Sequence, residues 1–257
     1  MYAIDWREST FDPDADSASC DRGKDGPISG RNDRNSVCRD LSLTEESSEG
    51  PAGSGRASEL GLSNFGENKV QEAEGKARDL ADLSLNWSII GHLQTNKVNS
   101  MIKFASEFHA LDSIRLADAL QARLGAEGRR LDVFVQVNTS GEVSKYGLSP
   151  NEVGDFVRRL PDYPALIARG FMTLAIFSRD ADKVRGCFKL LRQLRDALRD
   201  RISPRLNLLS MGMTSDFEMA IEEGADVIRV GQAIFGPRPT KDRHYWPGLL
   251  RGNEGSS

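Results

Sequence analysis

The sequence has little cysteine, no surplus of positive charge and no long apolar run. Its three cysteines, Cys20, Cys38 and Cys187, are odd in number and widely spaced, which argues against a disulfide framework and a zinc ribbon. A formal net charge of −4 provides no attraction to nucleic acid or anionic lipid. No stretch reaches the ~18 apolar residues that span a bilayer, and the charged start MYAIDWREST lacks the apolar run of a signal peptide. We therefore expect a cytoplasmic protein whose partners include neither nucleic acid nor membrane.

Signatures of covalent and metal-dependent catalysis are also absent. No G-x-S-x-G element and no Cys-His arrangement indicates a covalent hydrolase. No set of His, Asp and Glu residues has the spacing of metal ligands, so we expect no metal site. Metal and triad chemistry are therefore poorly supported, and we assign no catalytic residue.

The chain divides into unlike parts. Residues 1–60 are crowded with Ser, Asp, Glu, Gly and Arg and nearly free of branched aliphatic residues. Such a segment buries too little apolar surface to offset its ordering entropy, so we expect it to be disordered or poorly packed. In residues 61–238, short apolar runs alternate with longer amphipathic runs, which predicts β-α-β units and a parallel sheet. Residues 239–257 form a tail to which we assign no chemistry.

Seven strand-helix units are recognisable in residues 61–238. We predict strands at 63–67, 87–91, 108–111, 133–138, 167–173, 206–210 and 227–230, and helices at 70–80, 114–124, 152–160, 181–199 and 217–223. An open doubly wound sheet is the alternative, but no G-x-G-x-x-G loop follows the first strand. A closed barrel needs eight units and about 250 residues. The sequence therefore predicts an α/β protein, a (β/α)8 TIM barrel whose first strand is missing or divergent and ought to lie in residues 1–60.

The loop after the sixth predicted strand, which begins at Ser210, is a candidate anion site. In such barrels the loops after the last two strands commonly bind phosphate. Gly212 permits close approach of the backbone, and hydroxyls such as that of Thr214 combine with free amide groups to hold an anion. Ser215 and Glu218 also have the spacing of a capping box, which requires no ligand. Both interpretations stay open, since one loop can serve both purposes.

The loop after the last strand gives a second candidate. Gly231 and Gln232 follow the strand directly, and their amide groups can face a phosphate. Arg229 lies inside the otherwise apolar run IRVG. Because a buried arginine is costly unless it is paired, this side chain either points into a polar site or meets a carboxylate. We favour the site.

Further polar residues close other predicted strands. Asn68 follows the strand at 63–67, and His92 follows the strand at 87–91. His92, Asn138 and Lys145 are better explained as hydrogen-bonded structural residues than as ligands or bases.

Several strings of the sequence carry a family resemblance: FGENKVQEA, WSIIGHLQTNK, VFVQVNTSGEVSKYG, GFMTL and LSMGMTSDFEMAIEEGADVIRVGQAIFG. They resemble the pyridoxal phosphate homeostasis proteins, the YggS or PROSC-like family, which is related to the N-terminal barrel of alanine racemase. The resemblance implies a barrel that binds pyridoxal 5′-phosphate and buffers or delivers it without an assigned reaction. It also implies phosphate contacts from Ser210 and the amides of Gly231 and Gln232, Arg229 at the pyridine nitrogen, and Asn68 beside the ring.

One part of the family pattern is missing. The family holds its cofactor as a Schiff base on a lysine at the end of the first barrel strand, about twenty residues before GEN, where this sequence reads TEESS. Lys24 is the only lysine before Lys69, and no apolar strand surrounds it. We therefore expect reversible, noncovalent binding. A shifted reading frame, a misassigned start or a degenerate gene would explain the change at residue 60.

Two other functions remain as alternatives, an inactive remnant and a racemase-like or lyase-like enzyme that uses pyridoxal phosphate. The enzyme is disfavoured, because alanine racemase draws a tyrosine from a second domain for which little chain remains after Arg238. The expected partners are the cofactor itself and apoenzymes that depend on it, and the expected state is a monomer or weak dimer.

Overall fold

The structure, a computed structural model, describes residues 2–4, 40–44 and 50–235. Lys24 and the predicted tail at 239–257 lie outside these residues. The strands are β1 (Tyr2–Ile4), β2 (Asp40–Thr44), β3 (Asn64–Glu67), β4 (Asn86–Ile89), β5 (Ala105–Leu111), β6 (Leu131–Gln136), β7 (Leu166–Met172), β8 (Leu208–Met213) and β9 (Val227–Arg229). The helices are α1 (Gly50–Glu59), α2 (Val70–Asp79), α3 (Val98–Met101), α4 (Ile114–Ala126), α5 (Val153–Arg159), α6 (Ala181–Arg201), α7 (Phe217–Glu222) and α8 (Gln232–Phe235), with 3-10 turns η1 (Thr95–Lys97) and η2 (Leu160–Asp162).

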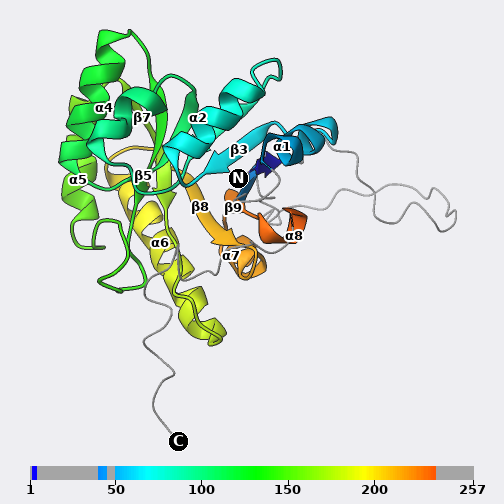
Figure 1. The fold of residues 1–257 in the computed structure, drawn as a ribbon. Coiled ribbons are helices and arrows are strands. Elements are labelled where there is room, and N and C mark those ends of the chain that lie inside the picture. Colours follow the sequence, from blue (N-terminus) through cyan, green and yellow to red (C-terminus); the bar gives the residue numbers. More distant parts are fainter. Residues whose placement is uncertain (1, 5–39, 45–49, 236–257) are drawn as a thin grey trace, which may run out of the picture.

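Parallel strands form a closed barrel with helices on its outside (Figure 1). Each strand from β2 to β9 pairs in parallel with the next one along the chain, and β2 also pairs with β9. Strands covered on both faces favour branched and aromatic apolar residues, as the run Val133, Phe134 and Val135 of β6 illustrates; all three are buried. The predicted α/β barrel is confirmed.

The sequence led us to expect a missing or divergent first strand, but the structure has this strand, β2. This strand lies between β3 and β9, with Leu43 opposite Phe65 and Leu41 opposite Ile228. The short β1 adds antiparallel pairing to β2 and β3. β2 reads DLSLT, a five-residue alternating run inside a polar segment, so a search for a continuous apolar run passes over it. The barrel therefore has its first strand within residues 1–60.

Helix α6 illustrates how the sequence pattern fixes an outer helix. Its buried residues, Val184, Cys187, Phe188 and Leu191, recur at spacings of three and four, which places them on one face. Asp180 caps the helix by accepting hydrogen bonds from two free amide groups at its start. The predicted helix at 181–199 is two residues shorter than the observed one.

The end of β8 differs from its prediction in a way that affects the site. The strand was predicted at 206–210 but runs from Leu208 to Met213, so Gly212 belongs to the strand. The pairing of β8 with β9 shifts register between Ser210 and Met213. Glycine at the shift relieves the strain, because Gly212 has a φ of 96°, which L side chains rarely adopt.

No helix among the described residues combines the length and the apolar character required to cross a bilayer.

Candidate functional site

The loops after β8 and β9 meet at the carboxyl ends of the strands. The amide of Gly231 donates a hydrogen bond of 3.3 Å to Oγ1 of Thr214, which joins the two loops directly. The amide of Met213 donates to Oδ1 of Asp216 at 2.6 Å and fixes the first loop. A Cβ added to Gly212 would lie 2.6 Å from that of Ala220, so the strand end packs tightly against α7. The structure thus brings both predicted anion loops to one place.

The capping box suggested for Ser215 and Glu218 does not begin α7. The residue before the first helical turn is Asp216, and its side chain makes no capping hydrogen bond to the helix. The carboxylate of Asp216 is instead used within the loop, at the amide of Met213. Burial raises its pKa above the ordinary value, although the hydrogen bond from Met213 and the charges of Arg229 and Lys145 act to lower it. Both cations therefore act on this loop.

Arg229 is buried at the end of β9 and holds three elements together. Its Nη1 donates to the carbonyl oxygen of Ser210 at 3.3 Å and to Oγ of Ser210 at 3.0 Å, and its Nη2 donates to the carbonyl oxygen of Thr173 at 2.6 Å. Among the residues that the structure describes, none accepts a hydrogen bond from the buried Nε. Burial lowers the pKa of Arg229 to about 10, while Asp216 acts to raise it, so the side chain is cationic at neutral pH.

A line of polar side chains runs from Arg229 into the barrel. Oγ of Ser210 lies 3.1 Å from Nδ1 of His109, and Nε2 of His109 lies 2.8 Å from Oε2 of Glu107. The same Glu107 oxygen accepts a hydrogen bond of 3.0 Å from Ser88. Ser210 and His109 are fully buried. The pKa of Glu107 lies below its ordinary value: burial raises it, but the hydrogen bond and charge of His109, with smaller effects of Ser88 and Arg169, outweigh that effect.

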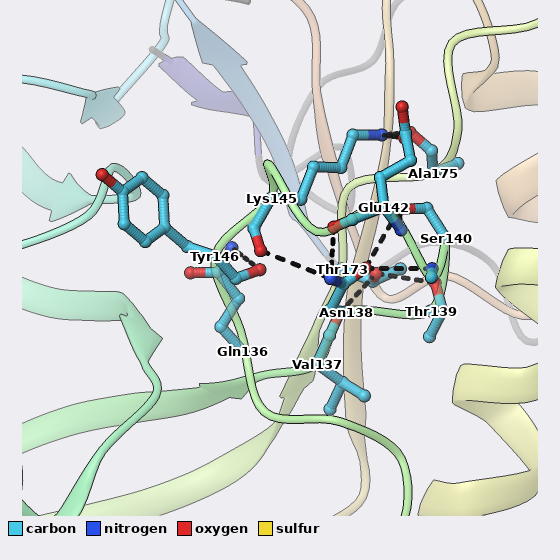
Figure 2. A network of polar contacts seen from close by, with 11 residues as sticks. Gln136, Val137, Asn138, Thr139, Ser140, Glu142, Lys145, Tyr146, Thr173 and Ala175 are labelled. Atoms are coloured by element: carbon cyan, nitrogen blue, oxygen red, sulfur yellow. Dashed lines mark hydrogen bonds and ion pairs between the residues drawn. The ribbon is translucent and has the colours of Figure 1, made fainter. Parts of the chain in front are cut away.

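The loops after β6 and β7 form a polar network beside these residues (Figure 2). Lys145 spans the two loops by donating to the carbonyl oxygen of Ala175 at 2.7 Å, and it pairs with Glu142 at 2.6 Å. Asn138 donates to the carbonyl oxygens of Glu142 and Lys145 at 2.8 and 3.3 Å. Oγ1 of Thr173 donates to the carbonyl oxygen of Val137 at 2.8 Å. The network holds Thr173, an acceptor for Arg229, in place.

His92 and Asn68 lie at neighbouring strand ends. The His92 ring stacks on Tyr146 with centroids 3.8 Å apart and 8° between planes, and its Nδ1 lies 3.5 Å from Oδ2 of Asp112. This accords with the structural role expected for His92. The turn of Asn68 passes so close to Gly91 that a Cβ there would lie 2.3 Å from the Asn68 carbonyl oxygen.

The predicted site residues therefore fall into two sets. Hydrogen bonds join Ser210 to Arg229 and Thr214 to Gly231, and Gly212 lies between Ser210 and Thr214 in the chain. Asn68 instead lies after β3, and Gln232 is exposed at the start of α8. Sequence reasoning missed Glu107 and His109. The signal was available, since His109 lies in the apolar run FHAL as Arg229 lies in IRVG.

A separate hollow lies at the opposite end of the barrel. It has a volume of about 470 Å³ and lies where β6 and β7 begin, beside η2 and the end of α6. Its lining includes Leu160, Tyr163, Leu166 and Leu206. It is no part of the site at the carboxyl ends. Within the described ranges, no group of three or more His, Cys, Asp or Glu side chains is placed to hold a metal ion.

Comparison with known proteins places these features in a family. The profile described as the alanine racemase N-terminal domain matches residues 53–239. The pyridoxal phosphate homeostasis protein of Aquifex aeolicus is 40% identical over 178 residues, which cover 69% of this chain and 78% of the relative. The Homo sapiens protein of the same name is 38% identical over 200 residues, covering 71% and 73% of the two chains.

Solved structures agree with the fold. PipY of Synechococcus elongatus PCC7942, in its structure with PLP bound, is 32% identical and has a TM-score of 0.70 over 76% of this chain and 92% of that one. An alanine racemase of Clostridium difficile 630 superposes with a TM-score of 0.65 over 79% of this chain and 56% of that one, but at 13% identity this likeness concerns the fold alone.

Proposed function

Since this chain belongs to the alanine racemase N-terminal domain family, and within it to the pyridoxal phosphate homeostasis proteins, we propose that it binds pyridoxal 5′-phosphate and holds it reversibly for other proteins. The relatives' names and the PLP-bound PipY structure support this ligand. The buried Nε of Arg229 and the two joined loops support it independently.

The observation that carries the proposal is the buried Nε of Arg229. Both terminal nitrogens of the guanidinium are occupied by Ser210 and Thr173, while Nε has no acceptor among the described residues. An unsatisfied buried donor costs about 1 to 3 kcal/mol, and more when it is charged. The pyridine nitrogen of the cofactor is an uncharged acceptor of the kind that would satisfy it.

The phosphate group would lie at the two joined loops. Thr214 offers a hydroxyl and Gly231 an amide group at the point where the loops meet, and Gln232 continues the second loop. Close packing at Gly212 keeps the first loop near the backbone of α7. The resemblance implies a phosphate contact for Ser210, but its Oγ contacts His109 and Arg229, so we assign Ser210 instead to the ring end of the site, through Arg229. We assign Asn68, after β3, to the ring pocket.

The identity of the residue at the ring nitrogen favours a carrier over an enzyme. Bound pyridoxal 5′-phosphate supplies an electrophilic aldehyde and an electron sink, and the sink is strongest when the ring nitrogen is protonated. Arginine can donate a hydrogen bond to that nitrogen but does not transfer its proton at neutral pH, because its guanidinium stays charged. Arg229 therefore binds the ring without activating it, and we propose a noncatalytic function.

We further propose that the association is noncovalent. The sequence contains no lysine between Lys24 and Lys69, a stretch that includes β2 and the region after it. A Schiff base needs a neutral lysine amine in a partly desolvated pocket.

Titration of the purified chain with pyridoxal 5′-phosphate tests both parts. We expect saturable binding by equilibrium dialysis, full release on dilution, and no labelled lysine after borohydride reduction and peptide mapping. Absence of saturable binding by a cooperatively folded chain would refute the function and favour an inactive remnant. A single labelled lysine would refute only the noncovalent mode. Interconversion of alanine enantiomers by the loaded chain would identify a racemase instead.

A further inference from the structure

The polar line through the barrel has an unusual position. The interior of such barrels is normally filled by layers of branched apolar side chains. Ser210 of β8 and His109 of β5 have β6 and β7 between them in the sheet, so their hydrogen bond crosses the interior rather than following it. His109 also packs on Phe134, with ring centroids 4.2 Å apart. Two fully buried polar groups therefore meet across the barrel interior, where apolar side chains are the rule.

The hydrogen bonds of this line are consistent with one direction of donation. Glu107 can only accept when ionised, and its lowered pKa keeps it so at neutral pH; hence Nε2 of His109 carries a proton. The second bond of the ring depends on its tautomer: where Nε2 alone carries a proton, Nδ1 accepts from the Ser210 hydroxyl. The Ser210 oxygen keeps its lone pairs for Nη1 of Arg229. Each group in the line donates or accepts as its chemistry allows.

We propose that Glu107 and His109 are positioning residues that hold Arg229, through Ser210, with its Nε directed at the ring nitrogen of the bound cofactor. The inference deepens the proposed function and rests on it. Glu107 selects the tautomer of His109, His109 orients the Ser210 hydroxyl, and Ser210 fixes one arm of the guanidinium. Thr173 fixes the other arm from β7. Neither Glu107 nor His109 is assigned a contact with the cofactor.

Two ligands can distinguish a loss of the positioning of Arg229 from a general weakening of binding. The first is pyridoxal 5′-phosphate, and the second is its analogue in which CH replaces the ring nitrogen, so that only the hydrogen bond to Nε is lost. A hydrogen bond from a charged donor contributes about 1.5 to 3 kcal/mol. We expect the native chain to bind the natural cofactor roughly tenfold or more tightly than the analogue.

Substitutions at His109 should change this preference selectively. His109→Leu removes the acceptor for Ser210, so the ratio of the affinities for cofactor and analogue should fall to about two or below. His109→Asn can retain an acceptor near the Nδ1 position and should keep most of this ratio. In a Ser210→Ala background, His109→Leu should cause no further loss, because the effect passes through Ser210. Glu127→Gln, at an exposed carboxylate after α4, is the matched control for Glu107→Gln, which should reduce the preference.

The outcomes are distinguishable. If the folded native chain binds neither probe, the proposed function fails. If it binds the natural cofactor but His109→Leu and Glu107→Gln weaken both probes equally, the function stands and the positioning role is refuted. Circular dichroism and thermal unfolding establish that each variant is folded. Should His109→Leu not fold, the comparison of Glu107→Gln with Glu127→Gln decides the matter alone.

Discussion

Arg229 links the end of β9 to β8 and to the loop after β7, and it is the residue that we propose at the ring nitrogen. A lysine at this position keeps the charge but replaces a planar fork by one ammonium group, which cannot serve Ser210, Thr173 and a ring nitrogen together. Arg229→Lys should therefore weaken binding of pyridoxal 5′-phosphate by about tenfold to a hundredfold in a fluorescence titration. Arg205→Lys, at an exposed arginine beside the hollow at the other end of the barrel, should leave it unchanged. Equal affinities in the two variants would contradict the assignment.

Glu107 gives the molecule a predictable response to acid. Its pKa in the folded chain lies below the ordinary value of 4.5, so the unfolded chain takes up a proton first as pH falls. The stabilisation from Glu107 is therefore complete above about pH 4.5 and is lost as pH falls through the lower folded value. The free energy of unfolding, measured with urea, should therefore fall less between pH 6 and pH 3.5 for Glu107→Gln than for the native chain. Because the change with pH is compared, a cost of the substitution that is the same at every pH does not affect the result.

The residues of the site were predictable where a polar side chain interrupts an apolar strand. Arg229 was found in this way, and the same reasoning applies to His109. The partner of His109 could not be read from the sequence, because β5 and β8 are not neighbours in the sheet and His109 meets Ser210 across the barrel interior. Glu107 precedes the strand predicted at 108–111, so its contact with His109 depended on a strand start that the pattern did not give.

At the scale of single elements, the carboxyl end of β8 is held by Gly212. Its φ of 96° is unfavourable for an L side chain, and an added Cβ would lie 2.6 Å from that of Ala220. Gly212→Ala should therefore lower the free energy of unfolding by about 2 to 4 kcal/mol. Gly186→Ala makes the same change inside α6, where the added Cβ meets no atom within 4 Å, and should raise stability by about 0.5 to 1 kcal/mol. Chemical denaturation measures both, and changes of equal sign would contradict the argument.

Amphipathic helices and fully buried strands were predictable elements. The apolar stripe of α6 predicts a helix buried on one face, and the continuous apolar run of β6 predicts a strand buried on both faces. β2 was not predictable by the same means, since five alternating residues in a polar segment differ little from a loop. Its identity as a strand comes from the unpaired edges of β3 and β9 on either side, a property of the whole sheet.

At the scale of the whole molecule, β2 decides whether the barrel is closed. Proline has no backbone N–H, so in the middle of a sheet it removes a hydrogen bond of the ladder. Ser42 lies opposite Arg229 of β9, so Ser42→Pro should interrupt closure beside the site and lower the melting temperature. It should also weaken binding of pyridoxal 5′-phosphate. Ser42→Val keeps the N–H and a strand-favouring shape, and should melt close to the native chain; a similar loss in both would show that backbone pairing is not the cause.

Because β2 pairs with β9, the barrel can close only after β9 has been synthesised. β2 leaves the ribosome well before Val227–Arg229, because β3 to β8 lie between them in the chain. Until then the growing chain exposes the edges of an open parallel sheet, which are prone to wrong pairing. Because Arg229 belongs to β9, a chain that stops before β9 would lack both the strand that pairs with β2 and the donor that we propose for the ring nitrogen.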